Sequence, residues 1–152
     1  HTLDTFEVLC QKKNLAICTD LPDGPLIVCA DMGRIQQVLY NLIDNAIKFS
    51  PAGKEILVSV HERKKLVFVS VKDFGEGISK ENLPKIWERF YKTDVSRGRD
   101  KKGIGLGLSI VREIIRAHSQ NINVISTEGV GTEFIFTLAT PERNNPHRRD
   151  GR

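Results

Sequence analysis

The stretch between Asp31 and Phe49 constrains the fold more than any other part of the chain. Its apolar residues are spaced four, three, four and three positions apart, which places them along one face of an α-helix. They are Ile35, Leu39, Leu42, Ala46 and Phe49. Asp31 is a suitable N-cap, and Pro51 and Gly53 follow the last apolar position. The pattern predicts a long helix over residues 31–49 that packs one face against a core.

Alternating apolar and polar residues, typical of β-strands, occur on both sides of this helix. The predicted strands cover residues 15–19, 26–29, 56–61, 66–71, 122–126 and 133–138. The last four form two predicted hairpins, and shorter helices are predicted over residues 79–89 and 106–118. Because strands and helices do not alternate as βαβ units, the sequence predicts an α+β fold, with an antiparallel or mixed sheet and helices on one face.

Composition narrows the class of protein. With 152 residues, a hydrophobic fraction of 39% and a net charge of +4, the chain resembles one ordinary globular domain. Residues 141–152, predicted to be a disordered tail, hold four arginines and two acids, so the body is only mildly basic and no nucleic-acid partner is expected. The three cysteines lack metal-ligand spacing and are expected to be reduced and mostly buried: Cys10, Cys18 and Cys29.

The sequence gives no sign of membrane insertion. No apolar run reaches the roughly 20 residues of a membrane span, and residue 1 is not followed by the basic and apolar regions of a signal peptide. We expect a cytoplasmic domain over residues 15–140, preceded at 1–14 by the end of a helix or linker.

Two asparagines lie four residues apart within the predicted long helix. Asparagine is a poor residue for a helix interior, so Asn41 and Asn45 call for an explanation. At 100° per residue they form a row with Arg34 and Lys48, roughly 110° from the middle of the apolar stripe. Amide oxygens suit Mg²⁺, and a lysine neutralises phosphates, so the row is compatible with a magnesium–nucleotide site. A solvated polar face is an equally good explanation of the row alone.

A carboxylate and two glycines follow the predicted strand 66–71. Asp73, Gly75 and Gly77 stand where a backbone can approach a flat ligand closely. A carboxylate there accepts a hydrogen bond from the exocyclic amine of adenine and repels the carbonyl oxygen of guanine. The alternative is a tight turn between a strand and a helix, with an incidental aspartate.

Three alternating glycines, Gly103, Gly105 and Gly107, lead into the predicted helix 106–118. Backbone N–H groups at a helix start bind phosphate. The segment differs from a dinucleotide-binding fingerprint and from a P-loop, and a flexible hinge is the alternative. The basic residues at 92–102 just before it form either a mobile cationic lid or a solvated charge run.

Taken together and in this order, these motifs closely resemble the catalytic and ATP-binding domain of bacterial sensor histidine kinases, a branch of the GHKL-type ATPases that include gyrase and the heat-shock chaperones. The resemblance covers roughly residues 15–139. It implies a Bergerat-type fold, a two-layer sandwich in which a mixed, mostly antiparallel sheet of about five strands is covered on one face by three helices.

The resemblance also implies roles for individual residues. Asn45 resembles the Mg²⁺ ligand, Asn41 and Lys48 would lie near the phosphates of ATP, and Asp73 would hold the adenine amine. Lys92 stands where arginine is frequent in the family, so the γ-phosphate contact passes to Arg97 or Arg99. The other implied nucleotide contacts are Gly75, Gly77, Ile78, Phe90, Tyr91, Lys92, Gly103, Gly105, Leu106, Gly107, Leu108 and Thr132.

Asn41 further distinguishes phosphoryl transfer from hydrolysis. The gyrase and chaperone ATPases carry a water-activating glutamate at this position, and an amide cannot act as a general base. The resemblance therefore implies transfer to a histidine on a dimerisation domain of the same parent protein and onward to a response regulator. It also implies a membrane-anchored parent and a monomeric isolated domain. A related serine kinase or switch and a nucleotide-binding pseudo-kinase are the alternatives.

Overall fold

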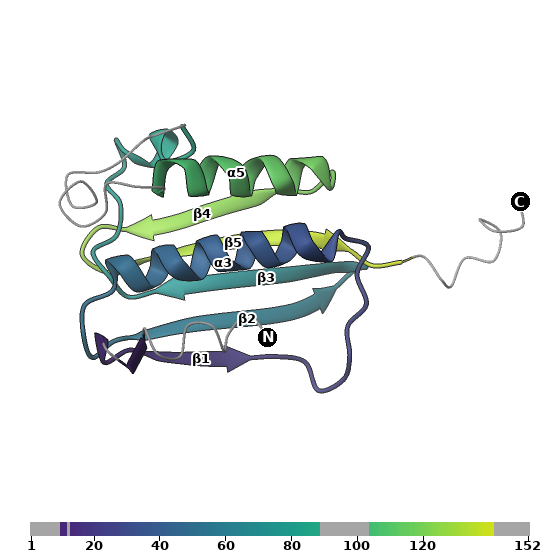
Figure 1. Ribbon diagram of the computed structural model, residues 1–152, viewed down its shortest axis with the longest axis horizontal. Helices are drawn as coiled ribbons and strands as arrows, with labels where there is room; N and C mark the ends of the chain where they lie inside the picture. The colour runs from purple at the N-terminus through teal and green to yellow at the C-terminus, as the bar shows by residue number, and fades with distance from the viewer. Residues whose placement is uncertain (1–9, 12, 89–103, 142–152) are drawn as a thin grey trace, which may run out of the picture.

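A computed structural model of the chain describes residues 10–11, 13–88 and 104–141 (Figure 1). These residues form a five-stranded sheet of order β1-β2-β3-β5-β4. The strands are β1 (Ala16–Asp20), β2 (Glu55–Arg63), β3 (Leu66–Asp73), β4 (Ile122–Thr127) and β5 (Gly131–Ala139). β1 pairs with β2 in parallel and the remaining pairs are antiparallel. The predicted α+β fold with a mixed, mostly antiparallel sheet is confirmed.

Helices α3 (Met32–Phe49) and α5 (Ile104–Ala117) lie side by side over one face of the sheet (Figure 1). The hydrophobic core fills the space between this helical layer and the sheet. Strands β2, β3 and β5 bury every second residue toward it, as expected for a sheet with one covered face. On α5, the predicted inward residues are buried: Leu108, Val111, Ile114 and Ile115.

Helix α3 begins and ends as its sequence predicts. The carboxylate of Asp31 accepts a hydrogen bond from the Arg34 N–H at 3.2 Å, which is an N-cap. At the other end, the hydroxyl of Ser50 donates to the Ala46 carbonyl at 2.6 Å. The ammonium of Lys13 donates to the carbonyls of Ile47 and Lys48 at 2.6 and 3.1 Å. These partners donate to carbonyl oxygens of the last helical turn, for which the helix itself supplies no N–H donor one turn further on.

The buried face of α3 is wider than the predicted stripe. Its buried residues are Ile35, Val38, Leu42, Ile43, Ala46 and Ile47, whereas Leu39 and Phe49 are only half-buried. The reason is that α3 packs against both the sheet and α5, so that two adjoining faces are covered instead of one.

Two predicted elements differ in the structure. Residues 26–29 do not form a strand, since only Cys29 makes a single bridge, to Ala139. Over the described residues 79–88, the helix predicted for 79–89 is reduced to a short 3₁₀ helix, η1 (Leu83–Lys85). Pro84 has no N–H to donate, and its ring disfavours an α-helix running through it from Ser79. The described residues therefore contain two long α-helices and not the predicted three.

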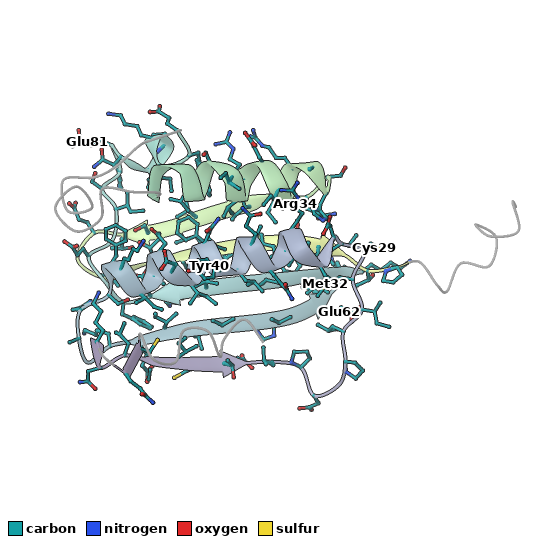
Figure 2. The ribbon with its side chains drawn as sticks, in the orientation of Figure 1. Cys29, Met32, Arg34, Tyr40, Glu62 and Glu81 are labelled. Carbon is teal, nitrogen blue, oxygen red and sulfur yellow. The ribbon has the colours of Figure 1, made fainter. Side chains whose placement is uncertain are left out.

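The cysteines also differ from expectation. Within the described residues all three are free thiols, but Cys10 alone is buried, Cys18 is half-buried and Cys29 is exposed. Figure 2 shows Cys29 near the N-terminal end of α3, close to Met32. None of the helices within the described part of the chain is long and apolar enough to cross a membrane.

Candidate functional site

The asparagine row of α3 faces the start of α5. Asn41 and Asn45 are both half-buried. A Cβ atom added at Gly107 would lie 3.8 Å from Cγ of Asn41, so the first turn of α5 passes directly over Asn41. Arg34, the first member of the predicted row, lies at the other end of α3, beside the C-terminal half of α5 (Figure 2). The structure thus brings the glycine segment at the start of α5 to Asn41 and leaves Arg34 at the other end of α3.

Asn45 carries an unsatisfied oxygen. Its side-chain Oδ1 is buried and has no hydrogen-bond partner among the described residues. Buried polar atoms without partners are rare in folded proteins, and each one calls for a ligand or an explanation. A neutral amide oxygen is a hard ligand of the kind that Mg²⁺ accepts. This buried oxygen therefore suits one ligand position of a magnesium ion.

Lys48 is held by a neighbour that the sequence interpretation did not single out. Its ammonium lies 2.9 Å from Oδ2 of Asp44, one helical turn earlier, with both side chains about one-third exposed or less. Charge pairs at this spacing are common on helices, and the spacing itself was the available signal. The pair restrains the lysine cation on the half-buried side of α3, one turn after Asp44.

Asp73 is a buried carboxylate at the end of β3, with 6% of its surface exposed. Burial raises the pKa of the Asp73 carboxyl above its ordinary value of 3.8, and hydrogen bonds from the backbone of Gly75 and Thr132 partly oppose that rise in pKa. The Gly75 N–H donates to Oδ1 at 2.9 Å. The carboxylate is therefore fixed in position and shielded from water, and it is suited to accept a hydrogen bond from a ligand amine.

Two glycines around Asp73 are required by contacts within the protein. A side chain at Gly75 would collide with the carbonyl oxygen of Phe49, at the end of α3. A side chain at Gly77 would collide with the carbonyl oxygen of Thr127, and Gly77 has a positive φ of 75°. The sequence interpretation assigned these glycines to close approach of a ligand. The structure shows that they let the loop after Asp73 pack against α3 and the β4–β5 turn.

Gly77→Ala is expected to destabilise the chain more than Gly129→Ala. Both glycines have positive φ, 75° and 82°, but nothing lies within 4 Å of a Cβ atom added at Gly129. Gly129→Ala should cost about 1 kcal/mol of unfolding free energy from backbone strain alone, whereas Gly77→Ala should cost about 3 kcal/mol because the loop must also move. Urea denaturation of both variants measures the difference. Equal losses would show that the contact with Thr127 is unimportant.

The remaining predicted site residues fall into three groups. The backbone of Gly105 and Leu106 lies in the first turn of α5, which begins at Ile104 and so earlier than predicted. Leu108 lies in the hydrophobic core, Ile78 packs against it, and Thr132 is buried beside Asp73. Six predicted residues lie outside the described residues: Phe90, Tyr91, Lys92, Arg97, Arg99 and Gly103.

Residues 30–142 match the family described as "Histidine kinase-, DNA gyrase B-, and HSP90-like ATPase". The chain is 42% identical over 142 residues to the sensor histidine kinase WalK of Bacillus subtilis (strain 168). This match covers 92% of the chain and 23% of WalK. It is 46% identical over 112 residues to the sensor protein SrrB of Staphylococcus aureus (strain NCTC 8325 / PS 47), with 74% of the chain and 19% of SrrB covered. The chain therefore spans less than a quarter of the length of either relative.

Solved structures give the same picture of the fold. The nucleotide-free catalytic domain of histidine kinase ThkA superposes with a TM-score of 0.79 at 35% identity, covering 91% of this chain and 89% of that one. Full-length ShkA in complex with AMPPNP superposes with a TM-score of 0.80 at 29% identity, covering 92% of this chain and 29% of ShkA. The similarity to ThkA extends over nearly the whole of both chains.

Proposed function

Because the chain belongs to the family of histidine kinase-, DNA gyrase B- and HSP90-like ATPases, we propose that it is the ATP-binding catalytic domain of a sensor histidine kinase. The observation that supports this most strongly is the convergence of a buried carboxylate, Asp73, and the asparagine row of α3 on the same end of the helical layer. The C-terminal end of α3 contacts Gly75, and the first turn of α5 passes over Asn41. One ligand with a base and a phosphate chain would reach from Asp73 to the asparagine row.

The proposed orientation of ATP follows from the chemistry of each end. The Asp73 carboxylate accepts a hydrogen bond from the exocyclic amine of adenine, which a guanine carbonyl cannot supply. The phosphates lie toward Lys48, the asparagines and the start of α5, where backbone N–H groups favour anions. Asn45 would hold Mg²⁺, which when bound neutralises phosphate charge. Arg97 and Arg99, outside the described residues, stay proposed contacts of the γ-phosphate.

The site favours transfer over hydrolysis. Asn41 occupies a position on α3 from which a carboxylate would activate water, and its amide cannot take a proton. The neighbouring carboxylate, Asp44, is engaged by the ammonium of Lys48. What the site offers is positioning of ATP and neutralisation of its charge, which is the main requirement for phosphoryl transfer. The nucleophile would be a histidine outside this chain.

The proposed partners follow from this role. A histidine-bearing dimerisation domain of the same parent would accept the phosphoryl group, and a response regulator would receive it next. Residues 15–140 would form the catalytic domain, with 1–14 leading into it from the dimerisation domain and 141–152 as a tail. The domain would act in the cytoplasm within a parent anchored in the membrane.

Isothermal titration calorimetry of the chain with Mg-ATP and Mg-GTP tests the proposal. We expect ATP to bind at micromolar concentrations with one site per chain, and GTP to bind at least about 100-fold more weakly, because its carbonyl would face the Asp73 carboxylate. Equal affinity for the two nucleotides, or no binding of ATP, would contradict the proposed site.

A further inference from the structure

We propose that Ser126 is a positioning residue that sets the selectivity of the site for an amine-bearing purine. This inference rests on the proposed function, because it assumes that Asp73 receives the base. Ser126 is in β4, and its side chain faces the loop that follows Asp73. Neither composition nor spacing draws attention to a single serine in a strand, and its role is visible only from its hydrogen bonds.

The hydroxyl of Ser126 joins three separate parts of the site. Its oxygen accepts a hydrogen bond from the Ile78 N–H at 2.7 Å, which fastens the loop after Gly77. It donates to the carbonyl of Gly131 at 3.0 Å, and it lies 2.8 Å from Oγ1 of Thr132. A single hydroxyl therefore connects the loop, the start of β5 and the buried Thr132.

The Ser126 hydroxyl has only one proton to donate, and this determines whether the Thr132 hydroxyl donates or accepts in their hydrogen bond. Ser126 has one proton and two lone pairs. If its proton is donated to Gly131 and one lone pair accepts from Ile78, the second lone pair is left for the proton of Thr132. Thr132 then presents only an acceptor to its surroundings.

Thr132 stands next to the carboxylate that would read the base. It is the direct cross-strand partner of Asp73 in the β3–β5 pair, so the two side chains lie on the same face about 5 Å apart at Cβ. Both are buried, with 6% of each residue exposed. A ligand edge entering here would meet two acceptors, which favours an amine over a carbonyl.

The loop keeps other attachments when the Ser126 hydroxyl is removed. The Gly129 N–H donates to the carbonyl of Glu76 at 2.6 Å, and Gly77 packs against the carbonyl of Thr127. Ser126→Ala should therefore fold, with the loop in place but with the Thr132 hydroxyl free to rotate and donate. The expected consequence is a loss of selectivity greater than the loss of stability.

The test compares ATP with inosine triphosphate, which carries a carbonyl oxygen where ATP carries the exocyclic amine. Dissociation constants of both nucleotides are measured for the wild type, Ser126→Ala and Ser126→Thr, with thermal unfolding of each variant. Ser70→Ala is the matched control, because Ser70 is a strand serine whose hydroxyl donates to Glu133 at 2.6 Å on the other face of the β3–β5 pair from the buried Thr132.

Ser126→Ala should weaken ATP binding about tenfold. The ratio of the dissociation constant of inosine triphosphate to that of ATP should fall by a similar factor. Ser126→Thr, which keeps a hydroxyl, should restore both, and Ser70→Ala should change neither. Weaker binding of both nucleotides by the same factor, with an unchanged ratio, would overturn the inference and leave Ser126 a structural residue.

A second variant protects the test against misfolding. Thr132→Val removes the acceptor that Ser126 is inferred to orient. This single substitution should also lower the ratio of the two dissociation constants. In the double variant the two effects on the ratio should not add, because both act through one hydroxyl group; full additivity would overturn the inference. Failure of the wild type to bind ATP would instead refute the proposed function, so the two failures are distinguishable.

Discussion

Asp73→Asn is expected to weaken ATP binding by about 100-fold, because the lost hydrogen bond is a buried, charged one. The backbone N–H groups of Gly75 and Thr132 both donate to this side chain. An asparagine must keep its oxygen toward the Gly75 N–H, which puts its NH₂ group in place of the other carboxylate oxygen and toward the entering adenine amine. Two donors then face each other. Calorimetric titration with Mg-ATP measures the loss, and an unchanged affinity would refute the adenine assignment.

The same substitution, although it weakens binding, should not lower the stability of the fold at pH 7. Burial raises the pKa of Asp73 above 3.8, so the folded chain holds this proton more tightly than the unfolded chain does. The contribution of the carboxyl to stability is therefore fully present below the unfolded-state pKa and is lost as pH rises through the raised folded-state pKa. Asparagine does not ionise, so the variant should be at least as stable as the wild type at pH 7, and its relative advantage should shrink toward pH 4.

Asp20→Asn is the matched control for both measurements. Asp20 ends β1 as Asp73 ends β3, but its side chain is 65% exposed and lies 3.5 Å from Nε2 of His61. The control should leave ATP affinity unchanged. A loss of affinity in Asp73→Asn accompanied by a large loss of stability at pH 7 would point to unfolding and contradict the proposed role of the carboxylate.

Asn45→Ala is expected to abolish the magnesium dependence of ATP binding and to lower phosphoryl transfer by about 100-fold or more. The buried Oδ1 of Asn45 has no partner among the described residues, so its removal sacrifices no hydrogen bond shown by the structure. Alanine is also the better helix residue, by about 0.6 kcal/mol. The variant should therefore lose function without losing stability, and it should unfold at the same temperature as the wild type or at a higher one.

Titrations of ATP with and without magnesium measure this effect. Gln37→Ala is the matched control, since it removes an exposed amide from the same helix, and it should keep the full magnesium effect. A full magnesium effect in Asn45→Ala would refute the role of Asn45 as the metal ligand.

Elements with strong local signals were predictable from the sequence. The limits of α3 follow from its Asp31 cap and its apolar period, and β2 and β3 follow from alternation. Their hairpin needs a two-residue turn, which Lys64 and Lys65 provide with φ of 53° and 68°. The family resemblance rested on the order of motifs along these elements, and the family match over residues 30–142 agrees with it.

The features that could not be predicted from the sequence depend on tertiary contacts or on a single residue. The width of the buried face of α3 is set by the neighbouring α5, which a periodicity within one helix cannot reveal. Pro84 limited a predicted helix to one short 3₁₀ turn. Asp44 was detectable by its spacing from Lys48. Ser126 was not, since its partners are Ile78, 48 positions away in the sequence, and residues across a hairpin.

The most direct test of the proposed function is phosphoryl transfer from labelled Mg-ATP to the separately supplied histidine-bearing dimerisation domain of the parent protein. The expected product is a phosphoryl group on that domain that is labile in acid and stable in base. The chain alone should neither become labelled nor release phosphate at a comparable rate. Rapid release of phosphate without an acceptor, or an acid-stable label on serine, would contradict a catalytic domain that delivers the γ-phosphoryl group to histidine.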